Sequence, residues 1–179
     1  DLPEPYTISL DSLRIPRRYR RRVRFIGAIL PVQPSEVKRV EELRRELDAE
    51  DRFLIYASIS GPRRERIPLI ETLIKIFEEF PDDFRVVMSM GMVGGGSKPE
   101  RRGPLILIPW IENRFRYLKA CDLVVSRAGH ETILQSICYG KPQILIPTPG
   151  HTEQYANARR ARELGVAEAL EQFNLSTGR

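Results

Sequence analysis

Short apolar runs and amphipathic stretches follow one another along most of the chain. Runs of about four to eight apolar residues are typical of buried strands, and apolar residues spaced three and four apart are typical of helices that cover a sheet. We therefore expect strands at residues 23–30, 52–58, 84–90, 105–109, 122–126, 143–146 and 166–170. We expect helices at residues 35–47 (with Ser35 as N-cap), 65–80, 114–120, 153–164 and between Gly129 and Gly140.

This alternation predicts an α/β fold with a doubly wound parallel sheet, Rossmann-like, with helices on both faces. Residues 23–179 are expected to form one such domain. Ligands of these folds bind in the loops at the carboxyl ends of the strands. The loops expected to carry the site are residues 58–64, 91–98, 109–114, 126–131 and 147–154.

Residues 1–22 are rich in Pro and Arg and have no periodicity, so we expect an arm or linker there. Its run "RIPRRYRRR" is most simply a solvated arm, or one docked on a neighbour. Contact with anionic lipid or nucleic acid is the alternative. The formal charge of the chain is +5, and 24 of its 29 basic residues are Arg, which favours bidentate contacts with carboxylate or phosphate.

The composition is that of a soluble globular protein, with 41% hydrophobic and 30% charged residues among 179. The apolar runs are too short to span a membrane, and the absence of a secretory leader predicts a cytoplasmic location. The chain begins without Met, so we expect a processed protein or a piece of a longer one. Cys121 and Cys138 are expected to be reduced thiols. With two His and no HExxH spacing, no metal site and no cofactor are expected.

The stretch "SRAGHETILQ" (residues 126–135) reads as a strand end, a glycine-marked turn and the start of a helix. Such a helix start presents unpaired backbone N–H groups and a partial positive charge, which suits an anion. Gly129 allows close backbone approach, and Arg127 is expected to add a charge-assisted hydrogen bond. Gln135 falls off the apolar stripe of this helix, so we expect it to face the ligand. The stretch therefore predicts a phosphate site.

Two further loops carry suitable groups. "SISGPRR" offers hydroxyl and backbone donors at Ser58, Ser60 and Gly61, which suit a diphosphate or an acceptor. Glu153 and Gln154 open the helix after the 143–146 strand, and their acceptor and amide groups suit hydroxyl-rich ligands such as sugars. By contrast, "GMVGGGSKP" (residues 91–99) fails as a Walker A motif, because Ser97 precedes Lys98 and Pro follows, so a mobile loop is expected.

The order "PWIENRFRYLKACDLVVSRAGHETILQSICYGKPQILIP", then "EQYANA" and "LGVA", resembles the C-terminal, donor-binding domain of GT-B glycosyltransferases. The resemblance is to the family 28 type, which includes the bacterial N-acetylglucosaminyltransferase that makes lipid II. It covers residues 109–167, and weaker similarity extends back through "SISGP" to "FIGAILP". It implies a single GT-B C-terminal-type domain that binds a nucleotide-diphosphate sugar, with a UDP-sugar as the first expectation.

The resemblance also implies roles for individual residues. It implies that Trp110 and Ile111 pair with the nucleotide base. The diphosphate would be bound by Arg127, Gly129, His130, Glu131 and Thr132, the donor sugar by Glu153 and Gln154, and the phosphate side of the cleft would be formed by Ser58, Ser60 and Gly61. The family usually has Glu where this chain has Gln135, which would accept from one ribose hydroxyl and donate to the other.

GT-B enzymes have two domains, and the resemblance implies that the acceptor site and the catalytic base lie in an N-terminal domain or a partner subunit, as in the eukaryotic dolichol-linked GlcNAc transferase. We therefore assign no catalytic residue and expect the isolated domain to bind a nucleotide without transferring sugar. Peripheral contact with the membrane's inner face fits this expectation. The alternatives are a nucleotide-sugar 2-epimerase, for which further acid–base residues are not found, and a basic nucleic-acid-binding module, for which interleaved aromatic residues are not found.

Overall fold

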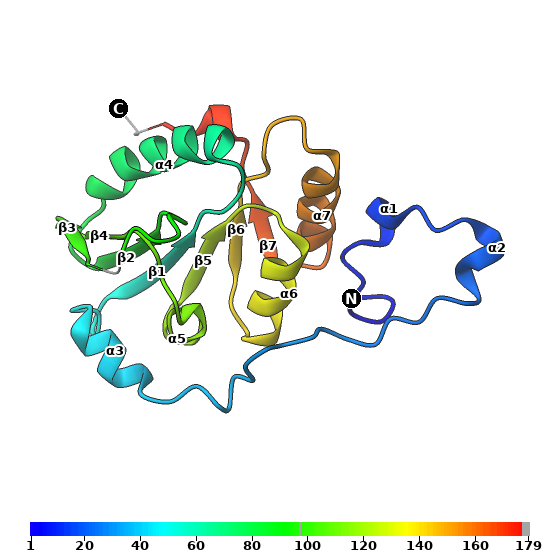
Figure 1. Ribbon diagram of the computed structural model, residues 1–179, viewed down its shortest axis with the longest axis horizontal. Helices are drawn as coiled ribbons and strands as arrows, with labels where there is room; N and C mark the ends of the chain where they lie inside the picture. Colours follow the sequence, from blue (N-terminus) through cyan, green and yellow to red (C-terminus); the bar gives the residue numbers. More distant parts are fainter. Residues whose placement is uncertain (97, 177–179) are drawn as a thin grey trace.

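A seven-stranded sheet lies at the centre of the computed structural model, which describes residues 1–96 and 98–176 (Figure 1). Ser97, which bore on the Walker A interpretation, lies outside the described residues. The strands are β1 Phe53–Ser58, β2 Phe84–Ser89, β3 Glu100–Arg102, β4 Leu105–Ile108, β5 Leu123–Ser126, β6 Gln143–Leu145 and β7 Ala167–Ala169. The helices are α1 Leu10–Leu13, α2 Arg17–Arg20, α3 Val40–Glu46, α4 Arg63–Glu78, α5 Arg114–Ala120, α6 His130–Cys138, α7 Thr152–Glu163 and the 3₁₀ helix η1 Gln172–Asn174.

The strand order is β3-β4-β2-β1-β5-β6-β7, and every neighbouring pair is parallel except β3 with β4. The predicted doubly wound parallel sheet is confirmed, with one antiparallel edge strand added. The sequence did not predict β3, because all of its residues are polar and exposed, and the strand exists only through its pairing with β4.

Helices cover both faces of the sheet, and the alternation of side chains along each strand decides which helix they meet. On one face, α3 and α5 pack over Tyr56 and Val124. On the opposite face, α4 packs over Ile55 and Val125. A third cluster joins α6 and α7 around Leu145 at the β6–β7 end of the sheet.

The strand predicted at residues 23–30 is wrong. This segment has no helix or strand, and the side chains of Ile26 and Ile29 are each 81% exposed. It runs from the arm toward α3 without meeting an edge of the sheet (Figure 1). An apolar run becomes a strand only where a neighbouring strand can pair with it, and the run itself does not encode that neighbour.

The helix predicted at residues 35–47 is shorter than expected. It begins at Val40, and the preceding Arg39 has a left-handed backbone with φ of 60°. Ser35 therefore lies outside the helix and is not its N-cap. Leu43 of the helix and Leu47, its C-cap residue, are buried in the cluster with α5.

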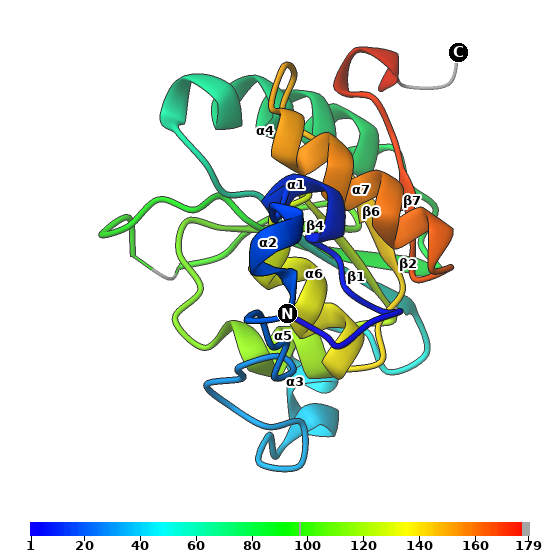
Figure 2. The same cartoon turned by 90° about the vertical axis from the view of Figure 1, so that its right-hand side faces the viewer.

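Residues 1–22 form an arm on one side of the domain, next to α7 (Figures 1 and 2). Ile8 anchors its start, since it is 1% exposed and belongs to the cluster of α6 and α7. Arg160 of α7 donates to the carbonyl of Thr7, and Arg159 pairs with Asp11. Within the described part of the chain, no helix combines the length and apolar character needed to cross a bilayer.

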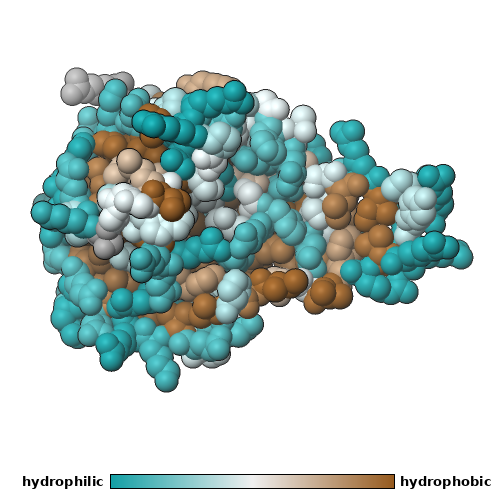
Figure 3. All heavy atoms as spheres, in the orientation of Figure 1, coloured by the Kyte–Doolittle hydropathy of each residue, from teal (hydrophilic) through white to brown (hydrophobic). Residues whose placement is uncertain are grey.

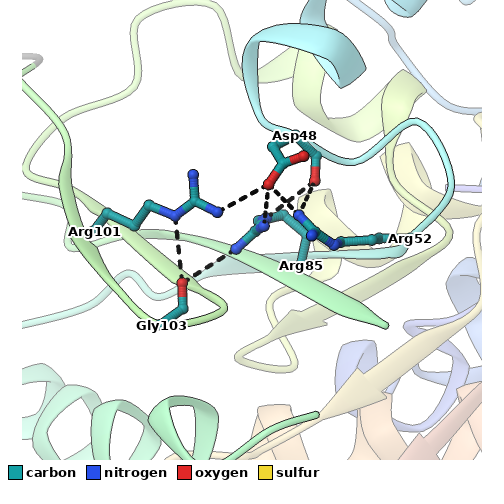
Figure 4. Close-up of polar contacts among 5 residues, drawn as sticks. All are labelled: Asp48, Arg52, Arg85, Arg101 and Gly103. Carbon is teal, nitrogen blue, oxygen red and sulfur yellow. Dashed lines mark hydrogen bonds and ion pairs between the residues drawn. The ribbon is translucent and has the colours of Figure 1, made fainter. Parts of the chain in front are cut away.

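The amino edge of the sheet holds a cluster of three arginines around one carboxylate (Figure 4). Asp48 accepts hydrogen bonds from the guanidinium groups of Arg52, Arg85 and Arg101. Arg85 also donates to the carbonyl of Gly103, at 3.2 Å. These bonds join the α3–β1 turn to β2, β3 and the turn before β4, so the amino edge is closed by contacts within the chain.

Candidate functional site

The five loops predicted to carry the site all follow the carboxyl ends of parallel strands, as expected. In the sheet, Ser58 at the end of β1 lies between Ser89 of β2 and Ser126 of β5. β1 leads through α4 to β2 on one side, whereas β5 and the strands after it lie on the other. Ligands of doubly wound sheets bind outside such a switch point. The loops at residues 58–64 and 126–131 flank it.

The start of α6 is open toward this edge. Gly129 is its N-cap residue, with φ of −72° and ψ of 133°, and no side chain accepts a hydrogen bond from the first turn. A side-chain carbon added at Gly129 would meet no atom within 4 Å. The first N–H groups of the helix are therefore available to an anion, and the absence of a side chain leaves room for it to approach.

The side chain of Arg127 does not serve this anion site, contrary to the expectation from sequence. Its guanidinium is 4% exposed and donates to the carbonyls of Ile146, Pro147 and Glu65 and to the side chain of Gln172. Burial lowers the pKa of Arg127, partly offset by Glu65. Neighbouring loops need a donor for their buried carbonyls, and Arg127 supplies it. The residue fastens the loop after β5 to its surroundings.

Glu131, on the first turn of α6, forms a bridge above the switch point. Its carboxylate accepts from the guanidinium of Arg114 at 2.8 Å and from the amide of Gln135 at 2.7 Å. The bridge joins α6 to α5 across 17 residues of sequence. Sequence reasoning placed Arg114 at the start of a helix and at the end of the 109–114 loop, and no local pattern marks its pairing with Glu131.

Gln135 lies deeper than predicted. Its side chain is 3% exposed and lines a cavity of about 20 Å³ together with Tyr56, Ser58, Thr132 and Arg114. Burial raises the pKa of Tyr56 to about 12, so its hydroxyl stays protonated at neutral pH. The cavity is too small for a ribose, so the expected contact of Gln135 with a ribose has no room in this arrangement.

His130 and Glu153 face a second space of about 440 Å³, which the arm closes with Asp1, Ser9 and Leu13 among others. The Nε2 atom of His130 lies 3.0 Å from the Asp1 carboxylate, though without hydrogen-bond geometry. Burial lowers the pKa of His130. A neutral imidazole is therefore favoured here at neutral pH.

The predicted sugar-contacting pair lies on the first turn of α7. Glu153 is exposed, whereas the side-chain oxygen of Gln154 accepts from the backbone N–H of Thr148 at 2.8 Å. The N-cap residue His151 accepts from the backbone N–H of Gln154 through Nδ1 at 3.4 Å. The side-chain oxygen of Gln154 thus accepts a hydrogen bond within its own loop.

The loops at residues 58–64 and 109–114, on the other side of the switch point, differ in the solvent exposure of their residues. Ser60 and Gly61 are exposed, and Gly61 has φ of +114°, a conformation that favours glycine. Trp110 is 37% exposed on the loop after β4, whereas Ile111 is buried in the core beneath it. The buried side chain of Ile111 anchors this loop to the core.

Comparison with known proteins fits this geometry. Residues 92–179 match the glycosyltransferase family 28 C-terminal domain. The matched part includes α5, α6 and α7. A protein of Desulforudis audaxviator named UDP-N-acetylglucosamine–N-acetylmuramyl-(pentapeptide) pyrophosphoryl-undecaprenol N-acetylglucosamine transferase is 31% identical over 162 residues, which cover 82% of this chain and 43% of that protein.

Two other similar proteins are also named as glycosyltransferases. A Methanopyrus kandleri protein named as an uncharacterized glycosyltransferase is 25% identical over 99% of this chain and 49% of its own length. The crystal structure of the glycosyltransferase SnogD from Streptomyces nogalater has a TM-score of 0.53 at 23% identity, covering 86% of this chain and 38% of that one, and it shows the shared fold. The chain spans less than half the length of the curated relatives it matches.

Proposed function

We propose that the chain is the donor-binding half of a glycosyltransferase and holds a nucleotide-diphosphate sugar at the start of α6. The observation that carries this proposal is the uncapped first turn of α6, which lies at the β1–β5 switch point within the family 28 domain. A diphosphate is the part of the donor that such a helix start suits best, because it meets both the unpaired N–H groups and the helix dipole.

In the proposed complex, the N–H groups of the α6 first turn, from Gly129 to Thr132, bind the diphosphate. Ser58, Ser60 and Gly61 approach it from the other side of the switch point. The base pairs with the backbone at Trp110 and Ile111, and the sugar hydroxyls meet Glu153 and Gln154. No residue of this chain is assigned the catalytic base.

The ribose site requires a local change. Glu131 holds both Arg114 and Gln135, so the amide of Gln135 becomes free for ribose only when the carboxylate turns away. Arg114, once released, lies near the expected position of the phosphates and offers a charge-assisted donor in place of the buried Arg127. When the Arg114–Glu131 bridge opens, an exposed ion pair is replaced by a contact between Arg114 and the nucleotide. Exposed ion pairs contribute little to stability, so breaking this one costs little free energy.

The acceptor site and the base belong, in this proposal, to an N-terminal domain or a partner subunit. The name of the Desulforudis relative specifies UDP-N-acetylglucosamine as its donor and a pyrophosphoryl-undecaprenol as its acceptor. UDP-N-acetylglucosamine is accordingly the first donor to test for this chain. We propose further that the protein works in the cytoplasm, in peripheral contact with the membrane's inner face, and without a nucleic-acid partner.

Isothermal titration calorimetry of the 179-residue chain with UDP, UDP-N-acetylglucosamine, UDP-glucose, GDP and dTDP tests the proposal. We expect the uridine compounds to bind and the purine nucleotide to bind more weakly. We also expect no sugar transfer by this chain alone. Failure of every nucleotide to bind at millimolar concentration, with the N-terminal half supplied, would refute the donor site. Sugar transfer by the chain alone would refute the division of roles.

A further inference from the structure

The positive charge of the chain is concentrated in the arm and the segment that follows it. Residues 12–30 contain seven Arg and no acidic residue. They contribute +7 to a chain whose net charge is +5, so the remaining residues are net −2. Residues 1–11 carry three acids, Asp1, Glu4 and Asp11, so residues 31–179 have a net charge of +1 and most of the positive charge of the chain lies in residues 12–30.

The seven arginines of this segment are exposed and have no carboxylate partner among the residues that the structure describes. They are Arg14, Arg17, Arg18, Arg20, Arg21, Arg22 and Arg24. The hydrogen bonds of two of them, Arg20 and Arg24, go to backbone carbonyls nearby. Elsewhere in the chain, arginines such as Arg159 and Arg160 do pair with acids. The charge of the arm is thus directed outward rather than used within the fold.

Apolar side chains accompany these arginines on the surface. Leu13 is 52% exposed and Leu10 43%, and Figure 3 shows apolar atoms of the arm flanked by hydrophilic ones. The arm also encloses a space of about 590 Å³, lined by Leu10, Ile15 and Phe25 together with Arg14, Arg20 and others. Guanidinium groups beside exposed aliphatic side chains match the headgroup region of a bilayer, where phosphates adjoin acyl chains.

The arm suits a lipid surface better than a nucleic acid. Its helices α1 and α2 have four residues each, too short to read a groove. The guanidinium carbon of Arg18 lies 4.8 Å from the centre of the Tyr19 ring. One face of this ring is therefore occupied by Arg18 and is not free to stack on a base. The arm is also fastened to the domain through Ile8 and α7, unlike a loose basic tail that folds on RNA.

We propose that residues 10–24 are a docking surface for anionic phospholipid headgroups, with the arginines on the phosphates and Leu10 and Leu13 in the interface. The proposal deepens the peripheral membrane contact of the proposed function and rests on that function for its biological setting. Leu13 also borders the space that holds His130 and Glu153. Docking of the arm would therefore hold the sugar end of the candidate site close to the bilayer surface.

Vesicle co-sedimentation of the 179-residue chain tests this surface. We expect binding to vesicles of phosphatidylcholine with phosphatidylglycerol, and little to phosphatidylcholine alone. Binding to the mixed vesicles should fall steeply between low and high salt. Equal binding to both compositions, or none to either, would overturn the proposal. So would a duplex or single-stranded RNA that removes the protein from anionic vesicles at equal phosphate concentration.

Variants that remove the same charge from the arm or from the domain distinguish the contribution of the arm to vesicle binding from that of net charge. Replacing Arg17, Arg21 and Arg22 by Gln should reduce partitioning onto anionic vesicles by about tenfold or more. Replacing the exposed residues Lys38, Lys75 and Lys98 by Gln removes the same charge from the domain and should leave partitioning nearly unchanged. Equal losses in the two variants would show that net charge, and not the arm, determines binding. The conservative variant with Lys at the three arm positions should retain most of the partitioning onto anionic vesicles.

Calorimetry with UDP distinguishes this inference from the donor site. The arm variants keep every residue of the proposed nucleotide site, so they should bind UDP as the parent does. A chain that binds UDP but not anionic vesicles would refute the docking surface alone. A chain that binds anionic vesicles but no nucleotide would refute the proposed function and leave the docking surface standing.

Discussion

The two edges of the sheet contrast in how their charged and polar groups are used. At the amino edge, the Asp48 carboxylate and the carbonyl of Gly103 satisfy arginines from three separate elements. At the carboxyl edge, the first turn of α6 has no side-chain cap, and the Arg114–Glu131 bridge lies exposed above a small cavity. An edge closed by its own contacts serves the fold, and an edge with uncommitted donors can serve a ligand.

Arg127 is an exception to this contrast, because it lies at the carboxyl edge and yet its two terminal nitrogens donate to groups of the fold. Replacing it by Met removes the donor of several buried carbonyls. We expect the free energy of unfolding to fall by about 2–4 kcal/mol. Urea denaturation measures this. A loss below about 0.5 kcal/mol would show that these bonds are replaced by water, and that Arg127 is available to a ligand after all.

Gly129→Val should give the opposite result, with a large effect on the ligand and a small one on the fold. A Cβ atom added at this position meets no protein atom within 4 Å, and the backbone has a β conformation that Val adopts readily. We expect UDP affinity to fall by about tenfold to a hundredfold, since the branched side chain occupies the approach of the diphosphate. Calorimetry measures the affinity and thermal denaturation the stability. Unchanged affinity would place the diphosphate elsewhere.

Gln135 tests the cavity beneath the bridge. Its change to Ala should weaken UDP binding by about 1–2 kcal/mol, the scale of one or two hydrogen bonds. Its change to Glu would bring a second carboxylate against Glu131, whose oxygen now accepts from the Gln135 amide at 2.7 Å. We therefore expect Gln135→Glu to lower the melting temperature at neutral pH, because two carboxylates would then lie side by side.

The matched control for these variants is Glu71→Ala. Glu71 is exposed on α4, outside every loop of the candidate site. Its change should leave UDP affinity and melting temperature as in the parent. A change in affinity there as large as that of Gln135→Ala would mean that the assay reports general charge effects and not the site.

The smallest expected effect is at the amino edge. Hydrogen bonds from Arg52 and Arg101 lower the pKa of Asp48 from 3.8 to about 2. A carboxyl group with a depressed pKa stabilises the fold above its unfolded value, and that contribution is lost as the pH falls through the folded value. The stability difference between the parent and Asp48→Asn should therefore be full above pH 4 and vanish near pH 2. Added salt should reduce it, because Asp48 is solvent-exposed. A difference that persists unchanged to pH 2 would contradict the pairing.

The sequence predicted those elements whose burial follows from their own composition. The helix at residues 114–120 was placed without error, and the strand ends at Ile108 and Ser126 lie within one residue of those expected. The two strands lie inside a sheet covered on both faces, so apolar character alone identifies them. The glycine-marked turn before α6 was likewise placed at the correct edge of the sheet.

What the sequence did not predict depends on neighbours far along the chain. The apolar run at residues 23–30 is unpaired, because no strand edge lies beside it. Arg127 lies in a sequence pattern that predicts phosphate binding. Its guanidinium instead donates to the carbonyl of Glu65, which is 62 residues away in the sequence. The pairing of Arg114 with Glu131 joins two helices that a local pattern treats separately. In each case a tertiary contact, absent from any short window, decides the role of the residue.

The most direct test of the donor site is a titration of the ¹⁵N-labelled chain with UDP, followed by amide chemical shifts. The largest changes should occur at the first turn of α6, from Gly129 to Thr132, and next at Ile111. Amides beside Asp48 and Arg85, at the closed amino edge, should not move. Changes concentrated at the amino edge, or none at the first turn of α6 at saturating UDP, would contradict the assignment of the donor site to the carboxyl edge.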